Sequence, residues 1–239
     1  MVAKTSVVVK GSEMEILVFE PQSDGPVPGI VVAQHLPVAH AGLELDPFTI
    51  DVGERLARAS YACVVPYVFH WWPRDEDIEV KRAEFRDDWT VADMAAAYDL
   101  LAGMARVNSD KIGVIGHCWG GRIAWLAACH NPGYNAAAVL YGGRIKAAMG
   151  PGSVPPSELA HQIPCPMIGI FGNDDENPSP ADVDDLDAAL TEAGVAHSFH
   201  RYDDAGHGFQ DFTNATRYRK AATADAWDKL LAFFDAELT

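Results

Sequence analysis

Residues 111–122 read Lys-Ile-Gly-Val-Ile-Gly-His-Cys-Trp-Gly-Gly-Arg, and the rest of the chain is organised around this stretch. The apolar run 112–115 predicts a short buried strand, and the apolar run 123–129 predicts a buried helix. The connection is so short that Cys118 must adopt a strained backbone, which the glycines two residues to either side permit because they lack a Cβ atom. The thiol is therefore expected at the end of a sheet, over the first turn of a helix whose dipole favours thiolate.

Two further polar loops follow predicted strands, as loops at the ligand-binding edge of an open α/β sheet do. Residues 171–178 read Phe-Gly-Asn-Asp-Asp-Glu-Asn-Pro, and residues 203–209 read Asp-Asp-Ala-Gly-His-Gly-Phe. The chain thus offers a nucleophile, an acid and a histidine in that order, and a thiolate needs an imidazole partner that a carboxylate orients. The spacing Gly-x-Cys-x-Gly alone is a weak signal, for which a buried structural cysteine in a glycine-rich turn is the alternative.

The composition sets limits on the function. The 239 residues suffice for a single α/β domain, residues 1–239, and the net charge of −16 argues against nucleic acid and anionic membranes as partners. The start of the chain leads into no signal-peptide core, so a cytoplasmic, reduced protein is expected. The four cysteines and nine histidines show no metal-ligand spacing, and Cys63, Cys129 and Cys165 are interpreted as small buried hydrophobes. No metal or cofactor is predicted, and the expected partner is a small-molecule substrate.

The hydrophobic pattern alternates between strands and helices, which predicts a doubly wound, mainly parallel sheet with helices on both faces. An antiparallel hairpin is expected to precede it. Strands are predicted at residues 5–10, 14–19, 29–34, 61–66, 112–115, 136–141, 166–171 and 196–202. Helices are predicted at residues 48–60, 90–106, 123–129, 181–193 and 223–238, with loops at 35–42, 67–86 and 142–156.

From about Pro28 to its end, the chain resembles the dienelactone hydrolase (carboxymethylenebutenolidase) family of α/β-hydrolases. The matching segments are Val-Val-Ala-Gln at 31–34, Gly-His-Cys-Trp-Gly-Gly at 116–121, Phe-Gly-Asn-Asp-Asp at 171–175 and Ala-Gly-His-Gly-Phe at 205–209. The resemblance implies the α/β-hydrolase fold and a cofactor-free hydrolase of lactones and esters, as a monomer or homodimer. It also implies Cys118 as nucleophile, His207 as base and Asp175 as orienting acid, with Asp174 as the rival acid.

The resemblance also implies an oxyanion hole formed by two backbone amides, those of Leu36 and Trp119. Preorganised amides of this kind lower the barrier to a tetrahedral oxyanion by roughly 3 kcal/mol each. Residue type leaves no trace of a backbone donor, so this prediction rests on position alone.

Two departures from the family pattern concern the substrate. His35 stands where the dienelactone enzymes carry a glutamate that holds the resting thiol; it could contact the thiol, serve as a second base, or fill a polar loop. Gln210 or Asp211 stands where the family has an arginine that clamps the carboxylate of the lactone, and an acidic group there would repel a carboxylate. Arg86 or Arg82 could supply another clamp, although both could equally be surface residues.

Several aromatic residues are expected on loops near the catalytic face of the domain. They suggest a large apolar pocket, and core packing is the alternative explanation. Phe69, Trp71 and Trp72 lie in the irregular segment, and Trp119 follows the nucleophile. Tyr141 and Arg144, at a strand end, are further candidates for the pocket.

These observations together predict a cysteine hydrolase of neutral or aryl-bearing esters or lactones that works through a covalent acyl-enzyme. Three alternatives stay open. The same groups could hydrolyse activated phosphotriesters, an oxidisable Cys118 could serve redox chemistry, or the fold could have become a catalytically silent binding module.

Overall fold

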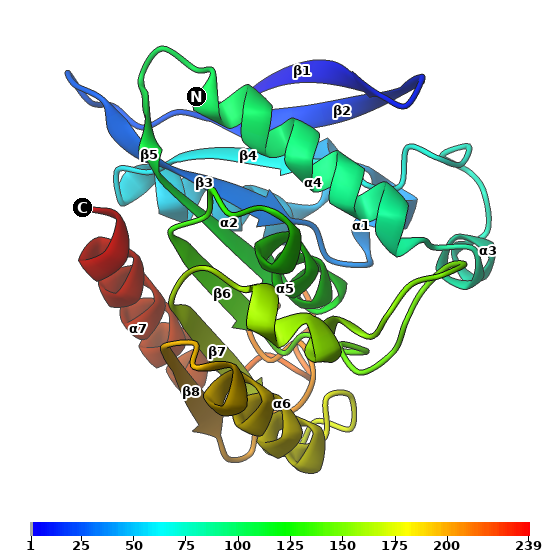
Figure 1. The fold of residues 1–239 in the computed structure, drawn as a ribbon. Helices are drawn as coiled ribbons and strands as arrows, with labels where there is room; N and C mark the ends of the chain where they lie inside the picture. Colours follow the sequence, from blue (N-terminus) through cyan, green and yellow to red (C-terminus); the bar gives the residue numbers. More distant parts are fainter. Residues whose placement is uncertain (1) are drawn as a thin grey trace.

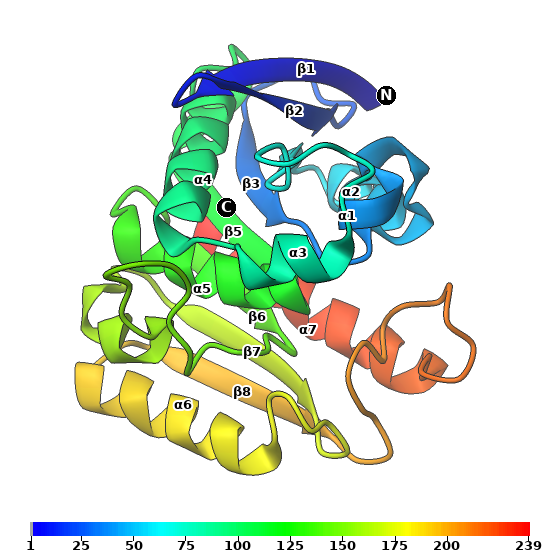
Figure 2. The ribbon, with the colours of Figure 1, turned by 90° about the vertical axis from the view of Figure 1, so that its right-hand side faces the viewer.

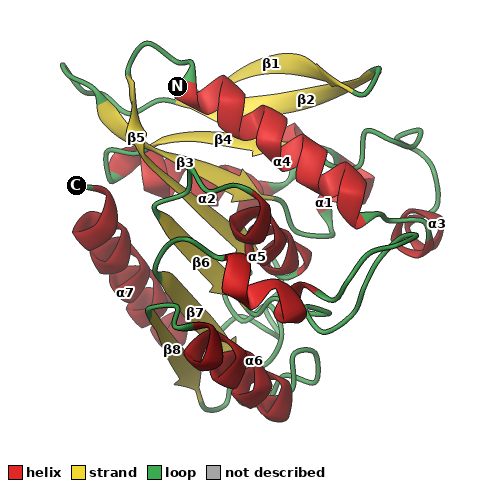
Figure 3. Cartoon of the chain, in the orientation of Figure 1, coloured by secondary structure: helices red, strands yellow, loops and turns green. Residues whose placement is uncertain are grey.

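The computed structural model describes residues 2–239, which form one eight-stranded sheet in the order β1-β2-β4-β3-β5-β6-β7-β8 (Figures 1 and 3). Strands β3 to β8 run parallel, whereas β1 and β2 form an antiparallel hairpin that joins the sheet through β4. The strands are β1 Val2–Val9, β2 Ser12–Phe19, β3 Val27–Ala33, β4 Ala62–Pro66, β5 Val107–His117, β6 Ala136–Leu140, β7 Met167–Gly172 and β8 His197–Tyr202.

Helices cover both faces of the sheet (Figure 2). On one face of the sheet, α4 packs on α5, and a 3₁₀ segment, Pro156–Gln162, lies in contact with both α5 and α6. The other face carries α2 and α7, where Arg55 of α2 stacks on Trp227 of α7. The helices are α1 Val38–Ala41, α2 Pro47–Arg58, α3 Ile78–Ala83, α4 Asp87–Ala102, α5 Trp119–His130, α6 Pro180–Ala193 and α7 Lys220–Leu238. No helix within residues 2–239 is both long and apolar enough to cross a membrane.

The predicted fold class is confirmed: a doubly wound α/β sheet with an antiparallel hairpin at its start. The central strands β3, β4 and β6 are buried along nearly their whole length, as parallel strands covered on both faces must be. The predicted strands and helices are all present, with shifted ends.

The differences lie where periodicity carries little information. The short helices α1 and α3 fall inside segments predicted as loop, because four and six residues are too few to show a helical period. Helix α4 begins at Asp87 and ends before Gly103, earlier at both ends than predicted. Strand β5 begins at Val107, five residues earlier than predicted. Its first half is polar, so the hydrophobic pattern did not mark it as strand, and this half pairs with the start of β3 only at Val27.

A buried ion pair ties α5 to α4. Arg122 is fully buried and places Nη1 2.5 Å and Nη2 3.1 Å from the two carboxylate oxygens of Asp87, the first residue of α4. The guanidinium also donates to the carbonyls of Arg144 and Ala147, at 3.2 and 2.7 Å. Because a buried charge is costly unless it is paired and hydrogen-bonded, these four contacts fix the loop after β6 against the helix that follows Cys118.

Candidate active site

The turn from β5 to α5 has the geometry that the glycine pattern predicts. Cys118 adopts φ 56° and ψ −122°, a conformation that costs a non-glycine residue about 1–3 kcal/mol. A Cβ atom on Gly116 would lie 1.8 Å from the carbonyl oxygen of Gly120, and one on Gly120 would lie 2.2 Å from that of Ala33. Only glycine fits at both positions, so the tight turn and the position of the thiol follow from the local sequence.

The two later loops bring Asp175 and His207 to the same edge of the sheet. His207 Nδ1 lies 2.9 Å from Asp175 Oδ2, and the Asp175 side chain is only 2% exposed. Because Nδ1 is bonded to Asp175, Nε2 is the ring nitrogen left to interact with Cys118, whose pKa His207 lowers. The rival acid, Asp174, is exposed to solvent, and its backbone N–H donates to the carbonyl of Ala205.

The surroundings of Cys118 favour the thiolate, in contrast to those of the other thiols. Burial raises the pKa of Cys129 and Cys165 to about 12. Burial acts in the same direction at Cys118, yet the pKa of this thiol lies below its ordinary value because His207 and the backbone N–H groups of Trp119 and Leu36 stabilise the sulfur anion. For His207, burial lowers the pKa, but the contacts with Asp175 and Cys118 outweigh it and raise the pKa to about 10. These opposite shifts are the ones that a thiolate–imidazolium pair would show.

The loop after β3, which carries Leu36, is held from several sides. Gln34 accepts a hydrogen bond from the backbone N–H of Val68 at 2.8 Å. His35 is buried, and its Nε2 lies 2.7 Å from Asp46 Oδ2, the carboxylate that also caps α2 through the N–H of Thr49. Of the roles left open for His35, this geometry describes a polar side chain that anchors the loop to α2.

A buried lysine holds the same loop from the other side. Lys81 of α3 has no exposed surface, and its ammonium donates to the carbonyls of Ala39 and Arg74 at 3.0 and 2.8 Å. Burial lowers the pKa of Lys81. Nothing in the sequence of the predicted loop 67–86 singles out this lysine among its charged neighbours.

The predicted pocket aromatics pack on one another and on neighbouring rings. Phe69 is fully buried and packs on Trp72 and Phe85, and Phe85 meets Trp119 edge-on with ring centroids 5.1 Å apart. This group reaches the residue next to Cys118. Trp71 stacks on Trp89 at 4.8 Å and donates to Asp93 at 3.0 Å, and Trp89 also meets Trp72 edge-on at 5.6 Å. Much of the aromatic surface is therefore engaged in packing.

The remaining candidates occupy different places. Tyr141 is buried, has φ 38°, and meets the ring of His207 edge-on at 5.5 Å. Arg144 follows in the same loop with φ 58° and an exposed side chain. Arg86 pairs with Asp88 at the start of α4 and lies 4.9 Å above the ring of Trp89. Tyr141 is thus the one of the three that touches the predicted triad.

Neither candidate for the position of the family's arginine, Gln210 or Asp211, is a basic residue. The side chain of Gln210 is 2% exposed, and neither of its polar atoms has a protein partner within the described residues. Asp211 accepts hydrogen bonds from the N–H and the hydroxyl of Thr213, at 2.9 and 2.6 Å.

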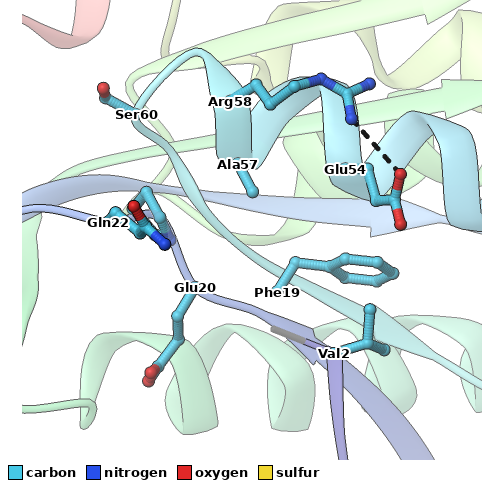
Figure 4. Close-up of a pocket in the computed structure, with 9 residues that line it drawn as sticks. Val2, Phe19, Glu20, Gln22, Glu54, Ala57, Arg58 and Ser60 are labelled. Atoms are coloured by element: carbon cyan, nitrogen blue, oxygen red, sulfur yellow. Dashed lines mark hydrogen bonds and ion pairs between the residues drawn. The ribbon is translucent and has the colours of Figure 1, made fainter.

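Two hollows of the molecule are not lined by Cys118, Asp175 or His207 themselves. A hollow of about 570 Å³ lies at the opposite edge, where the parallel strands begin, and includes the ion-paired side chains of Glu54 and Arg58 (Figure 4). A second hollow of about 330 Å³ lies beside Arg144 and Asn177. Within residues 2–239, no three histidine, cysteine or acidic side chains are grouped to hold a metal ion.

A mostly parallel sheet with a strained residue at the β5–α5 turn, followed by loops that present an acid and a histidine, defines an α/β-hydrolase fold. The chain belongs to the dienelactone hydrolase family, whose family model matches residues 14–238. The predicted family is confirmed, and the chain is a hydrolase of this type.

Individual relatives agree with the family. The chain is 30% identical over 242 residues to the Escherichia coli (strain K12) protein called "Putative carboxymethylenebutenolidase", covering 96% of this chain and 85% of the relative. The crystal structure of a "Putative Dienelactone Hydrolase" from Klebsiella pneumoniae superposes with a TM-score of 0.86 at 25% identity, covering 98% of both chains. A dienelactone hydrolase-like promiscuous phosphotriesterase from metagenomic libraries shares the fold, with a TM-score of 0.81 at 18% identity over 100% of this chain and 99% of the other.

Proposed function

We propose that this protein hydrolyses neutral or aryl-bearing carboxylic esters or lactones through Cys118, His207 and Asp175. The Cys118 thiolate attacks the carbonyl carbon, and the N–H groups of Leu36 and Trp119 receive the resulting oxyanion. The intermediate collapses, the carbon–oxygen bond to the leaving group breaks, and the His207 imidazolium gives its proton to the departing alkoxide. The product is a thioester on Cys118.

Water completes the cycle. Neutral His207 takes a proton from water while the hydroxide adds to the thioester carbonyl, and collapse of the second intermediate releases the carboxylic acid and the Cys118 thiolate. Asp175 keeps Nδ1 of His207 protonated and stabilises the imidazolium. The observation that carries the proposal is the strained Cys118 at the β5–α5 turn together with His207, which the buried carboxylate of Asp175 holds.

The preference for uncharged substrates rests on the residues after His207. Gln210 or Asp211 stands where the dienelactone enzymes have an arginine, and Asp211 would repel an anionic group nearby. Phe85 and Trp119 meet edge-on next to the nucleophile and are only 3% and 5% exposed, so an aryl group would bind over the small accessible part of these rings.

The charge state of Cys118 gives the first test. A thiolate band in the ultraviolet is expected to persist at pH values below the ordinary thiol pKa of 9.0. Because the pKa of His207 is raised to about 10, the thiolate–imidazolium pair should be lost above that pH and, at the acid end, below the lowered pKa of Cys118. The check is an absorbance titration of the wild type against Cys118→Ser. A wild-type thiol that titrates near its ordinary value would contradict the proposed pair.

Substrate class gives the second test, since the same nucleophile and amides could stabilise attack on an activated phosphotriester. A panel of phenyl butyrate, a carboxylate-bearing enol lactone and diethyl 4-nitrophenyl phosphate separates the possibilities. We expect kcat/KM for the neutral ester to exceed that for the anionic lactone by about tenfold or more. A preference for the lactone would overturn the substrate proposal, and no turnover of the phosphotriester at any enzyme concentration would remove that alternative.

A further inference from the structure

Two loops at the reactive edge are joined by a single side chain. Asn177, in the loop after β7, accepts a hydrogen bond through Oδ1 from the backbone N–H of Arg144, in the loop after β6, at 3.1 Å. The two loops approach so closely that a Cβ atom on Gly143 would lie 2.9 Å from the side-chain nitrogen Nδ2 of Asn177 and 2.9 Å from its backbone carbonyl oxygen. The glycine and the asparagine together make this contact possible.

The same asparagine contacts the predicted triad acid. Its backbone N–H donates to Asp175 Oδ1 at 2.8 Å, while the other carboxylate oxygen of Asp175 faces His207 Nδ1 at 2.9 Å. Both oxygens of Asp175 are therefore held, one by Asn177 and one by His207. The orientation of this carboxylate depends on where the backbone of Asn177 lies.

The loop to which Asn177 is tied is itself immobilised. Arg122, one helical turn beyond Cys118, donates to the carbonyl of Arg144 at 3.2 Å and is locked by its ion pair with Asp87. Met149, further along this loop, donates its N–H to Asp87 at 2.9 Å. The contacts thus run without a break from the helix that carries the nucleophile, through Arg144 and Asn177, to the acid.

We propose that Asn177 is a positioning residue: by fastening the loop after β7 to the loop after β6, its side chain fixes the carboxylate of Asp175 against His207. This role rests on the proposed hydrolase function. Without the side-chain tie, the loop relaxes, the hydrogen bond from His207 to Asp175 weakens, and His207 stabilises the thiolate less well. A residue that serves only the stability of the fold would leave the charge state of Cys118 unchanged.

The test compares three variants in the thiolate titration and in ester hydrolysis. Asn177→Ala removes the acceptor, Asn177→Asp retains it, and Asn173→Ala removes a hydrogen bond of the same loop, to Asp203 at 2.6 Å, that does not lead to Asp175. For Asn177→Ala we expect the onset of thiolate formation to rise by roughly 0.5–1 pH unit and kcat/KM to fall about 3- to 10-fold. Asn177→Asp and Asn173→Ala should both stay within about twofold of wild type. Because Asn177 is exposed and Asn173 is partly exposed, all three proteins should fold.

The outcomes distinguish the positioning role of Asn177 from the proposed hydrolase function on which it rests. If the wild type shows a thiolate that Cys118→Ser removes and Asn177→Ala does not shift it, the positioning role is wrong and the proposed function stands. An equal shift in Asn177→Ala and Asn173→Ala also overturns the role, because loop loosening in general would then suffice. If the wild type shows no such thiolate, both proposals fail.

Discussion

Replacing Cys118 with alanine is expected to lower kcat for p-nitrophenyl butyrate by roughly 10⁴- to 10⁶-fold. The thiolate is the attacking atom in the proposed reaction, so its removal leaves only the two backbone N–H groups and the binding site to assist attack by water. The substitution should affect catalysis and not folding, because alanine is smaller than cysteine and fits the same turn between the neighbouring glycines. Steady-state kinetics together with circular dichroism check both statements.

The matched control is another cysteine. Cys129 lies in α5, the helix that starts at the nucleophile, and burial raises the pKa of its thiol to about 12, so it is inert near neutral pH. Cys129→Ala should lose some stability through the small cavity but keep kcat within about twofold. Comparable activity in Cys118→Ala and wild type would remove Cys118 from the mechanism.

Replacing Asp175 with asparagine is expected to lower kcat by roughly 10³- to 10⁴-fold. One oxygen of Asp175 faces His207 Nδ1 at 2.9 Å, and an amide there can present an N–H and so stabilise the wrong imidazole tautomer. The imidazolium would also lose its counter-charge, so the thiolate should form only at a higher pH. Steady-state kinetics over a range of pH values report both effects.

The neighbouring residue provides a control of the same chemistry. Asp174 is exposed and precedes Asp175 in the chain, and Asp174→Asn removes the same charge from the same loop. We expect this variant to retain kcat within about threefold of wild type. A large loss in Asp174→Asn together with an active Asp175→Asn would assign the acid to Asp174 instead.

The fold could be predicted to a large extent because its signals are local. Buried parallel strands appear as continuous apolar runs such as residues 29–34. The β5–α5 turn is marked by glycines at positions where no side chain fits. The short helices α1 and α3 gave no signal, since a helix of one or two turns has no measurable period.

The residues of the candidate site could be predicted from the sequence only where they belong to a motif. Cys118, Asp175 and His207 stand in recognisable segments, whereas Arg122, Lys81 and Asn177 act through backbone groups distant in sequence. Arg122 did carry one usable signal, a single cation inside a run of apolar residues, which a buried helix admits only with a partner. Its partner, Asp87, could not be named because it comes from another helix.

The most direct test of the account is whether an acyl group becomes attached to Cys118. Stopped-flow mixing with p-nitrophenyl butyrate, combined with mass spectrometry of the acid-quenched protein and of its peptides, follows the leaving group and the adduct separately. The account predicts a butyryl adduct on the peptide that contains Cys118, formed during the burst and hydrolysed in turnover, and absent from Cys118→Ala. Turnover without any adduct, or with the adduct on another residue, would contradict it.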